Sequence, residues 1–281
     1  KDNDWLLIVV TLLITVFGLI MVFSSSYVWA LYTQGDYYFF IKRQFIWFLH
    51  GLFVFLFVMN VPFRFYRKLS PWIIGGSIII LGIVYFFGFE VYGAKRWLRI
   101  GPLTVQPSEF VKLGMIIYLA QVYSRKQAYI DQFLKGVLPP LIVVIIVLGF
   151  ILRQPDLGTA TAILSVAILI VFFSGAKIKH LFMLGAAGVA VFIFAVLAAP
   201  YRMRRITSYL DPFEYASTDG YQILQSYIAI AHGGLTGKGL GQSVQKLMYL
   251  PEPQTDFILA IISEELGILG VAFVFICYML I

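Results

Sequence analysis

WLLIVVTLLITVFGLIMVF, from Trp5 to Phe23, is a run of 19 residues that contains no charged side chain. A helix needs about 20 mostly apolar residues to cross a bilayer, whereas the apolar region of a cleaved signal peptide spans roughly 7–15. This run therefore predicts a retained membrane helix. The composition agrees, because 60% of the 281 residues are hydrophobic and only 12% are charged. A soluble domain is nearer half apolar and a quarter charged.

Seven further apolar stretches are candidate membrane helices. They are Phe45–Met59, Trp72–Phe89, Phe110–Tyr123, Val137–Leu152, Gly158–Phe173 and Leu181–Ala199, with an eighth span beginning near Ile268. We therefore expect an all-α polytopic membrane protein in which residues 1–281 form a single transmembrane domain, with residues 201–256 as one large loop within it. Because the last span stops at Ile281 and the chain starts at Lys1 without Met, we expect native chain beyond both ends.

The distribution of Lys and Arg predicts the orientation in the membrane, since short cytoplasmic loops are richer in these residues. If the N-terminus is cytoplasmic, the short inner segments carry nine Lys and Arg and the short outer segments carry six. Counting the long loop as well gives nine against eleven and does not decide the orientation. We therefore expect the N-terminus inside and residues 201–256 outside.

Two expected outer stretches, KRWLR and YRMRR, are dense in positive charge. In YRMRR, Arg202 and Arg205 can share one face of a helix, and arginine suits bidentate recognition of phosphate. Basic side chains that reach toward lipid headgroups also explain the pattern. The residues alone leave both interpretations open.

The glycines of GGLTGKGLG, residues 233–241, resemble those of a phosphate-binding loop. The full pattern GxxxxGK[ST] is not met, because Gly239 follows Lys238. We interpret this stretch as a flexible turn whose glycines permit close approach of the backbone.

A polar group is expected where PSEFVKL begins a helix. Glu109 and Lys112 are three residues apart and can meet on one helix face. Because a lone lysine inside a membrane span is costly, Lys112 should have a partner, either Glu109 or Asp156 of RQPDLGT. A structural ion pair and a direct catalytic role both fit this pattern.

YLPEPQTDFILAIISEELG places Asp256 at the edge of an apolar run. Pro251 and Pro253 exclude a helix interior, and Thr255 can cap a helix that begins at Asp256. One side of that helix would carry a small and polar seam that could line a cavity, formed by Asp256, Ala260, Ser263 and Gly267. Asp256 is then either a helix-capping acid or a general base whose pKa is raised by partial desolvation.

Taken together, GAKRWLRIG, QPSEFVKL, RQPDLGT, PYRMRRITSYLDP, GYQILQSYIAIAHGGLTGKGLGQS and LPEPQTDFILAIISEELG occur in an order and at a spacing that resemble the SEDS family (shape, elongation, division and sporulation). The stretches PEPQTDF and SYLDP lean toward its FtsW/SpoVE branch. The resemblance covers essentially the whole chain. It implies the SEDS fold of about ten membrane helices, of which eight fall within these residues.

The resemblance implies a peptidoglycan glycosyltransferase that polymerises lipid II at the outer face of the bacterial cytoplasmic membrane. The implied partners are lipid II, a class B penicillin-binding protein and other membrane proteins of division, elongation or sporulation, and not nucleic acid. Asp256 is implied as the general base or as a ligand of a divalent cation, Mg²⁺ or Mn²⁺, with no organic cofactor. Candidate residues for the pyrophosphate or for lipid II are Lys95, Arg96, Trp97, Arg99, Arg202, Arg205 and Ser243. Candidate supporting residues are Gln106, Ser108, Glu109, Lys112, Asp156 and Glu252.

Two other functions fit parts of this pattern. A lipid II flippase would also need a polar cavity and phosphate-binding arginines, but it would show gates on both faces, and the inner loops carry no comparable cluster. A membrane scaffold that only recruits the transpeptidase leaves the placement of Lys112 and Asp256 unexplained.

Overall fold

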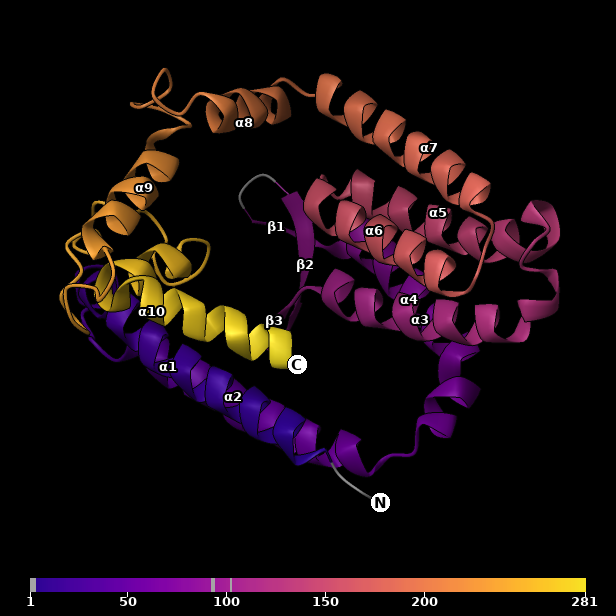
Figure 1. Cartoon of the computed structure of the whole chain (residues 1–281), viewed down its shortest axis with the longest axis horizontal. Coiled ribbons are helices and arrows are strands. Elements are labelled where there is room, and N and C mark those ends of the chain that lie inside the picture. The colour runs from indigo at the N-terminus through magenta and orange to yellow at the C-terminus, as the bar shows by residue number, and fades with distance from the viewer. Residues whose placement is uncertain (1–3, 92–93, 102) are drawn as a thin grey trace. The chain divides into compact units, whose positions relative to one another are not determined.

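The computed structural model describes residues 4–91, 94–101 and 103–281, most of which are helical (Figure 1). The long helices are α1 (Trp5–Gln34), α2 (Phe39–Asn60), α3 (Phe63–Phe87), α4 (Pro107–Arg125), α5 (Leu138–Arg153), α6 (Leu157–Phe173), α7 (Ile178–Leu197) and α10 (Ile258–Leu280). The shorter elements are α8 (Pro200–Leu210), α9 (Tyr221–Gly233), a 3₁₀ turn (Gln127–Tyr129) and a π-helical turn (Phe133–Val137). Six helices in the described part of the chain are long and apolar enough to cross a membrane, which confirms the all-α polytopic prediction.

The chain divides into two compact units. The central unit is Met59–Pro200, and the terminal unit combines Lys1–Val58 with Tyr201–Ile281. Each unit is described by itself below.

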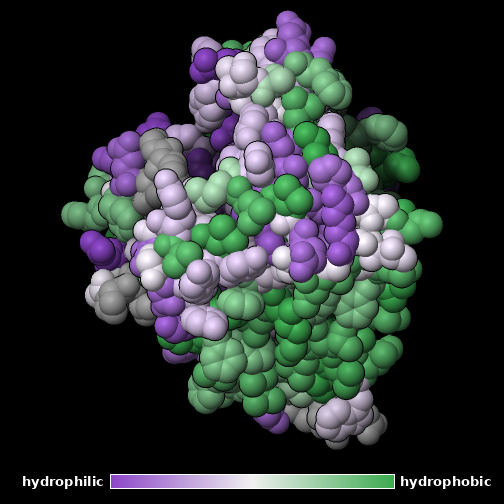
Figure 2. All heavy atoms as spheres, turned by 90° about the vertical axis from the view of Figure 1, so that its left-hand side faces the viewer, coloured by the Kyte–Doolittle hydropathy of each residue, from purple (hydrophilic) through white to green (hydrophobic). Residues whose placement is uncertain are grey.

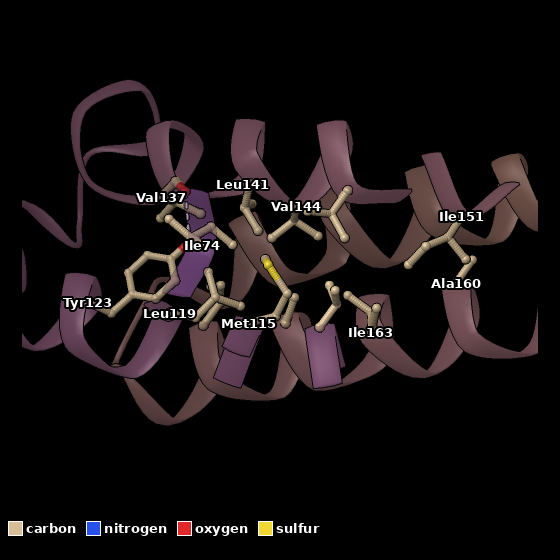
Figure 3. Close-up of a cluster of buried hydrophobic side chains, with 14 of the residues drawn as sticks. Ile74, Met115, Leu119, Tyr123, Val137, Leu141, Val144, Ile151, Ala160 and Ile163 are labelled. Atoms are coloured by element: carbon tan, nitrogen blue, oxygen red, sulfur yellow. Dashed lines mark hydrogen bonds between the residues drawn. The ribbon is translucent and has the colours of Figure 1, made fainter. Parts of the chain in front are cut away.

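The core of the central unit is built around α4 (Figure 3). Val111, Met115 and Leu119 recur every four residues, so they form one buried stripe that packs against α5 and α6. Because lipid tails are as apolar as leucine, helices in a membrane associate through close packing, and small residues such as Ala160 allow it. The Tyr123 hydroxyl enters this core and donates a hydrogen bond to the Val137 carbonyl at 2.8 Å.

Three short strands join α3 to α4: β1 (Phe89–Val91), β2 (Ala94–Ile100) and β3 (Leu103–Val105). They form an antiparallel sheet in the order β1-β2-β3, with Glu90 opposite Lys95 and Arg99 opposite Thr104. The all-helical interpretation of the sequence does not include this sheet. Lys95, Arg96 and Arg99 break the alternation of apolar and polar residues by which a strand is recognised.

Helix α3 begins earlier than the sequence predicts. Its first residue is Phe63, rather than Trp72, and the preceding Pro62 has an extended backbone. Arg64, Arg67 and Lys68 therefore lie on the first turns of a helix and not in a loop. Long basic side chains at the end of a membrane helix can extend toward the headgroups, which allows the helix to start among charges.

In the terminal unit, α10 packs against both α1 and α9, although α1 lies more than 200 residues away in the sequence (Figure 1). Gly267 inside α10 has φ 65° and ψ −161°, so α10 consists of two helical segments that meet at this residue. The expected span near Ile268 corresponds to the second segment. The prediction that Thr255 caps a helix beginning at Asp256 is wrong, because the helix starts at Ile258 after Phe257 and without a side-chain cap.

Apolar side chains cover much of the surface of both units. The described residues include many exposed Phe, Leu, Ile and Val side chains on α1, α2, α3 and α7. On the face shown in Figure 2, hydrophobic residues gather in the lower part and hydrophilic residues above them. Such a surface is typical of helices that contact lipid, so the chain is a multi-pass membrane protein.

Candidate functional site

The site begins with Asp256, which lies in the connection between α9 and α10. Its side chain is exposed in the turn directly before α10, and no hydrogen bond or ion pair joins it to another described residue. The neighbouring Pro253 and Gln254 are buried. Gln254 donates a hydrogen bond to the Glu252 carboxylate at 3.0 Å, which holds Glu252 within the same turn. Asp256 is therefore presented outward from a turn whose other side is packed.

Two residues of this connection adopt left-handed backbone conformations. Met248 has φ 73° and Glu252 has φ 48°. Each such residue costs of order 1–3 kcal/mol and persists only where the surrounding structure imposes it. Between them, Leu250 is 1% exposed and packs with Met21 and Ile261. The path toward Asp256 is thus fixed by packing rather than by local preference.

Ser243, a predicted substrate contact, lies 3% exposed in this structure. Its hydroxyl donates a hydrogen bond to the Glu264 carboxylate on α10. The backbone N–H groups of Val244 and Gln245 donate to the same carboxylate at 3.2 and 3.3 Å, and His232 Nδ1 lies 3.3 Å from it. Ser243 therefore fixes the loop to α10 in this structure.

A second buried acid lies next to the first. Glu265 and Lys246 are 0% and 1% exposed, and their charged atoms are 2.6 Å apart. Neither residue is among the candidates drawn from the sequence. The sequence does carry a pattern that could have indicated this pair. Glu264 and Glu265 lie inside an apolar helix, where a charge requires a partner.

The glycine-rich stretch makes the close approach predicted for it. A side chain at Gly233 would overlap the Ser263 carbonyl, and one at Gly237 would overlap the Glu265 carbonyl. Lys238 and Gly239 donate their backbone N–H groups to Glu264 and Glu265 carbonyls at 2.9 Å. The stretch is thus packed against the break in α10.

In the central unit, four candidate residues come together. Asp156 is 7% exposed and accepts hydrogen bonds from the Thr159 N–H at 3.0 Å and from the Gln106 amide at 3.2 Å. Gln106 also donates to the Ser108 hydroxyl at 3.1 Å. Arg96 lies 3.9 Å from Asp156. Asp156 therefore caps α6 and joins the starts of α4 and α6 to strand β2.

Arg96 differs from the other cations of KRWLR. Its guanidinium donates to the Gln154 carbonyl at 2.9 Å and to the Pro155 carbonyl. These carbonyls follow the last turn of α5, where backbone acceptors lack helical partners. Lys95 and Arg99 lie on the opposite face of the strand and are exposed, with Trp97 half-buried between them. Lys95 and Arg99 are therefore accessible, whereas the guanidinium of Arg96 is bound to backbone carbonyls.

The partner of Lys112 is Glu109. Their charged atoms are 2.8 Å apart, and both side chains are partly exposed on α4. Asp156, the other candidate partner, is bound to Thr159, Gln106 and Arg96 instead. The expected intrahelical pair is confirmed, and the pair with Asp156 is not formed.

In the terminal unit, Arg202 and Arg205 both lie on α8, three residues apart. Arg205 is exposed, and Arg202 is half-buried against the Tyr201 ring and hydroxyl. The apolar Met203, Ile206 and Leu210 recur at helical spacing on this short helix. Helix α8 is therefore amphipathic, as the membrane-surface interpretation expects.

A metal centre made by the protein alone is not formed in the described residues, since no three His, Cys, Asp or Glu side chains gather there. Mg²⁺ is commonly held by one or two carboxylates together with phosphate oxygens of the substrate and water. The exposed Asp256 fits that second arrangement.

A family model for FtsW, RodA and SpoVE, described as cell cycle protein, matches residues 4–281. The chain belongs to this family.

Two curated members of the FtsW/RodA/SpoVE family show the similarity in sequence. Stage V sporulation protein E of Bacillus subtilis (strain 168) is 46% identical over 269 residues, which cover 95% of this chain and 74% of the relative. Probable peptidoglycan glycosyltransferase FtsW of the same strain is 41% identical over 286 residues, which cover 98% of this chain and 71% of the relative.

Two solved structures show the similarity in fold. The rod shape determining protein RodA of Thermus thermophilus has a TM-score of 0.69 at 23% identity, covering 99% of this chain and 72% of that protein. The second structure is a chain of a peptidoglycan synthase complex that coordinates polymerization and crosslinking. It has a TM-score of 0.75 at 25% identity and covers 99% of this chain and 76% of that chain. The FtsW/RodA/SpoVE fold thus extends over nearly all of the chain.

Proposed function

We propose that this protein polymerises lipid II into glycan strands at the outer face of the cytoplasmic membrane, with Asp256 as the catalytic carboxylate. Peptidoglycan glycosyltransferase activity follows from family membership and from the names of its FtsW relatives. The observation that carries the role of Asp256 is its position, exposed and without a partner in the described chain on a turn whose other side is packed through Pro253 and Gln254.

The chemistry requires a base. The 4-hydroxyl of the acceptor sugar attacks the anomeric carbon of the donor, and the bond from that carbon to the lipid pyrophosphate breaks. Asp256 takes the hydroxyl proton, and the pyrophosphate leaves with the electron pair of the broken bond. The donor is α-linked and the product β-linked, so a single displacement with one base accounts for the inversion.

The leaving group gains negative charge, which cations stabilise. Lys95 and Arg99 on β2 are exposed candidates in the central unit, and Arg202 and Arg205 are the candidates in the terminal unit. We propose Arg202 and Arg205, which lie in the same unit as Asp256, as the residues that bind the pyrophosphate. Lys95, Arg99 and Trp97 of the central unit are proposed separately as a surface that binds lipid II. Arg96 and Ser243 serve the scaffold through the contacts described above.

A divalent cation, Mg²⁺ or Mn²⁺, is part of the proposal. This is the alternative to the role of Asp256 as base: Asp256 would hold the cation together with the pyrophosphate, and the charge of the cation would neutralise the leaving group. The removal of divalent cations by a chelator should then lower polymerisation, and adding Mg²⁺ or Mn²⁺ back should restore it.

Orientation and partner complete the proposal. A cytoplasmic N-terminus, supported by the Lys and Arg of the short loops, places the α9–α10 connection outside. A class B penicillin-binding protein is the proposed partner, supported by the similarity to a chain of a peptidoglycan synthase complex.

The test is glycan polymerisation from purified lipid II by the full-length protein with its cognate penicillin-binding protein. A ladder of glycan strands is the expected product. If a folded complex yields no ladder but moves lipid II across liposome membranes, the flippase is the better account. If it does neither and still binds the partner, the protein is a scaffold.

A further inference from the structure

Helix α1 meets the α9–α10 connection and the first segment of α10 at the buried pair of Lys246 and Glu265, although α1 lies more than 200 residues away in the sequence. Lys246 Nζ lies 2.6 Å from Glu265 Oε1. The other carboxylate oxygen of Glu265 accepts a hydrogen bond from the Ser24 hydroxyl on α1 at 2.6 Å. Lys246 also lies 3.4 Å from the Ser24 hydroxyl and 4.9 Å from the centre of the Tyr27 ring.

Every charge in this cluster has a partner. Both Glu265 oxygens are bound, and Lys246 has two hydrogen-bond partners and an aromatic face. A buried pair of this kind is strongly destabilised when only one member is removed, because the other charge remains without compensation. The replacement of both members by neutral groups is often tolerated.

The position of the cluster along the chain links it to Asp256. Lys246 precedes Asp256 by ten residues, and Glu265 follows it by nine. The pair therefore closes a loop that carries Asp256, and both ends of that loop are fixed on the first segment of α10. Met248 and Glu252, the two residues with left-handed backbone, lie inside this closed loop.

We propose that Lys246 and Glu265, supported by Ser24, are positioning residues that fix the Asp256 carboxylate for reaction. They do not touch the substrate, since both are buried. This inference rests on the proposed role of Asp256. Helix α1 takes part through Ser24, so the N-terminal membrane helix contributes to the catalytic geometry.

The test compares Lys246→Met, Glu265→Gln and the double variant in the full-length complex. Each is measured for thermal unfolding and for kcat and KM with lipid II. The single variants should lose stability, and the double variant should regain most of it. In the double variant kcat should still be at least about tenfold below wild type, with KM within about twofold, because a small misplacement of a catalytic group is costly.

The matched control is the exposed pair of Lys42 and Asp36, whose charged atoms are 2.7 Å apart. The double variant Lys42→Met with Asp36→Asn should keep wild-type stability and kcat. If the Lys246 and Glu265 double variant recovers kcat along with stability, the pair is only structural and the proposal is overturned. If that variant does not fold, Ser24→Ala replaces it, and an unchanged kcat in folded Ser24→Ala overturns the proposal.

A second measurement, the mobility of a spin label, does not depend on activity. It can therefore contradict this inference independently of the proposed function. A nitroxide label on Thr255→Cys, in a Cys277→Ala background, reports the mobility of the residue next to Asp256. The label should be restrained with the native pair and clearly more mobile in the double variant. An unchanged spectrum would contradict the positioning role even if the protein polymerises nothing.

Discussion

At the scale of single residues, neighbouring basic side chains of KRWLR make different contacts. Arg96 binds the backbone carbonyls of Gln154 and Pro155, whereas Lys95 beside it is exposed. The sequence KRWLR cannot reveal this difference, because it depends on the strand that sends neighbouring side chains to opposite faces. The residues alone left Asp256 as either a helix-capping acid or a base, and its catalytic role is what the family resemblance implies.

The contrast predicts different effects of the same substitution. Arg96→Gln should lower the free energy of unfolding by about 1–3 kcal/mol, because the partly buried Gln154 and Pro155 carbonyls lose a charged donor. Lys95→Gln should leave it unchanged. Thermal unfolding in detergent measures the stability of both variants. Equal stability would show that the contacts of Arg96 with the Gln154 and Pro155 carbonyls do not stabilise the fold.

At the scale of elements, the broken helix α10 organises the terminal unit. Ile268 and Leu269 donate their backbone N–H groups to the Gly234 and Leu235 carbonyls at 3.1 and 3.4 Å. The glycine-rich stretch thus supplies acceptors where the helix is interrupted at Gly267. The sequence predicted the close approach from the glycines but not what they approach, because their partner lies about 30 residues further along the chain.

This packing predicts that Gly233→Ala is strongly unfavourable. The added methyl group would overlap the Ser263 carbonyl, and overpacking typically costs about 1–3 kcal/mol. Gly76→Ala on α3 is the control, because nothing lies within 4 Å of its added carbon. Thermal unfolding of both variants is the measurement. A Gly233→Ala protein as stable as Gly76→Ala would mean that α9 and α10 are not in this contact.

At the scale of the whole molecule, hydrophobic runs predicted the membrane helices well and their ends less well. Each expected span corresponds to a helix, but α4 and α6 are not among the six described helices that are long and apolar enough to cross a membrane. The ends were less certain because charged residues extend several helices beyond their apolar runs, as Arg64 and Arg67 do on α3. The partners of buried charges, such as Lys246 and Glu265, depend on contacts between distant segments and could not be read from spacing.

The proposed orientation predicts which loops face the outside. In a Cys277→Ala background, Ala216→Cys in the α8–α9 connection should react with a membrane-impermeant maleimide in spheroplasts. Ala128→Cys between α4 and α5 should react only after permeabilisation. Both residues are exposed, so the difference reports the side of the membrane. The reverse pattern would place the N-terminus and Asp256 on the sides opposite to those proposed.

The most direct test of the central claim is the polymerisation rate of Asp256→Asn with purified lipid II and the cognate penicillin-binding protein. The control is Asp219→Asn, another exposed acid, in the α8–α9 connection. We expect Asp256→Asn to lose the glycan ladder while unfolding temperature and partner binding stay at wild-type values, and Asp219→Asn to retain all three. A normal ladder from Asp256→Asn would contradict the assignment of Asp256 as the catalytic carboxylate.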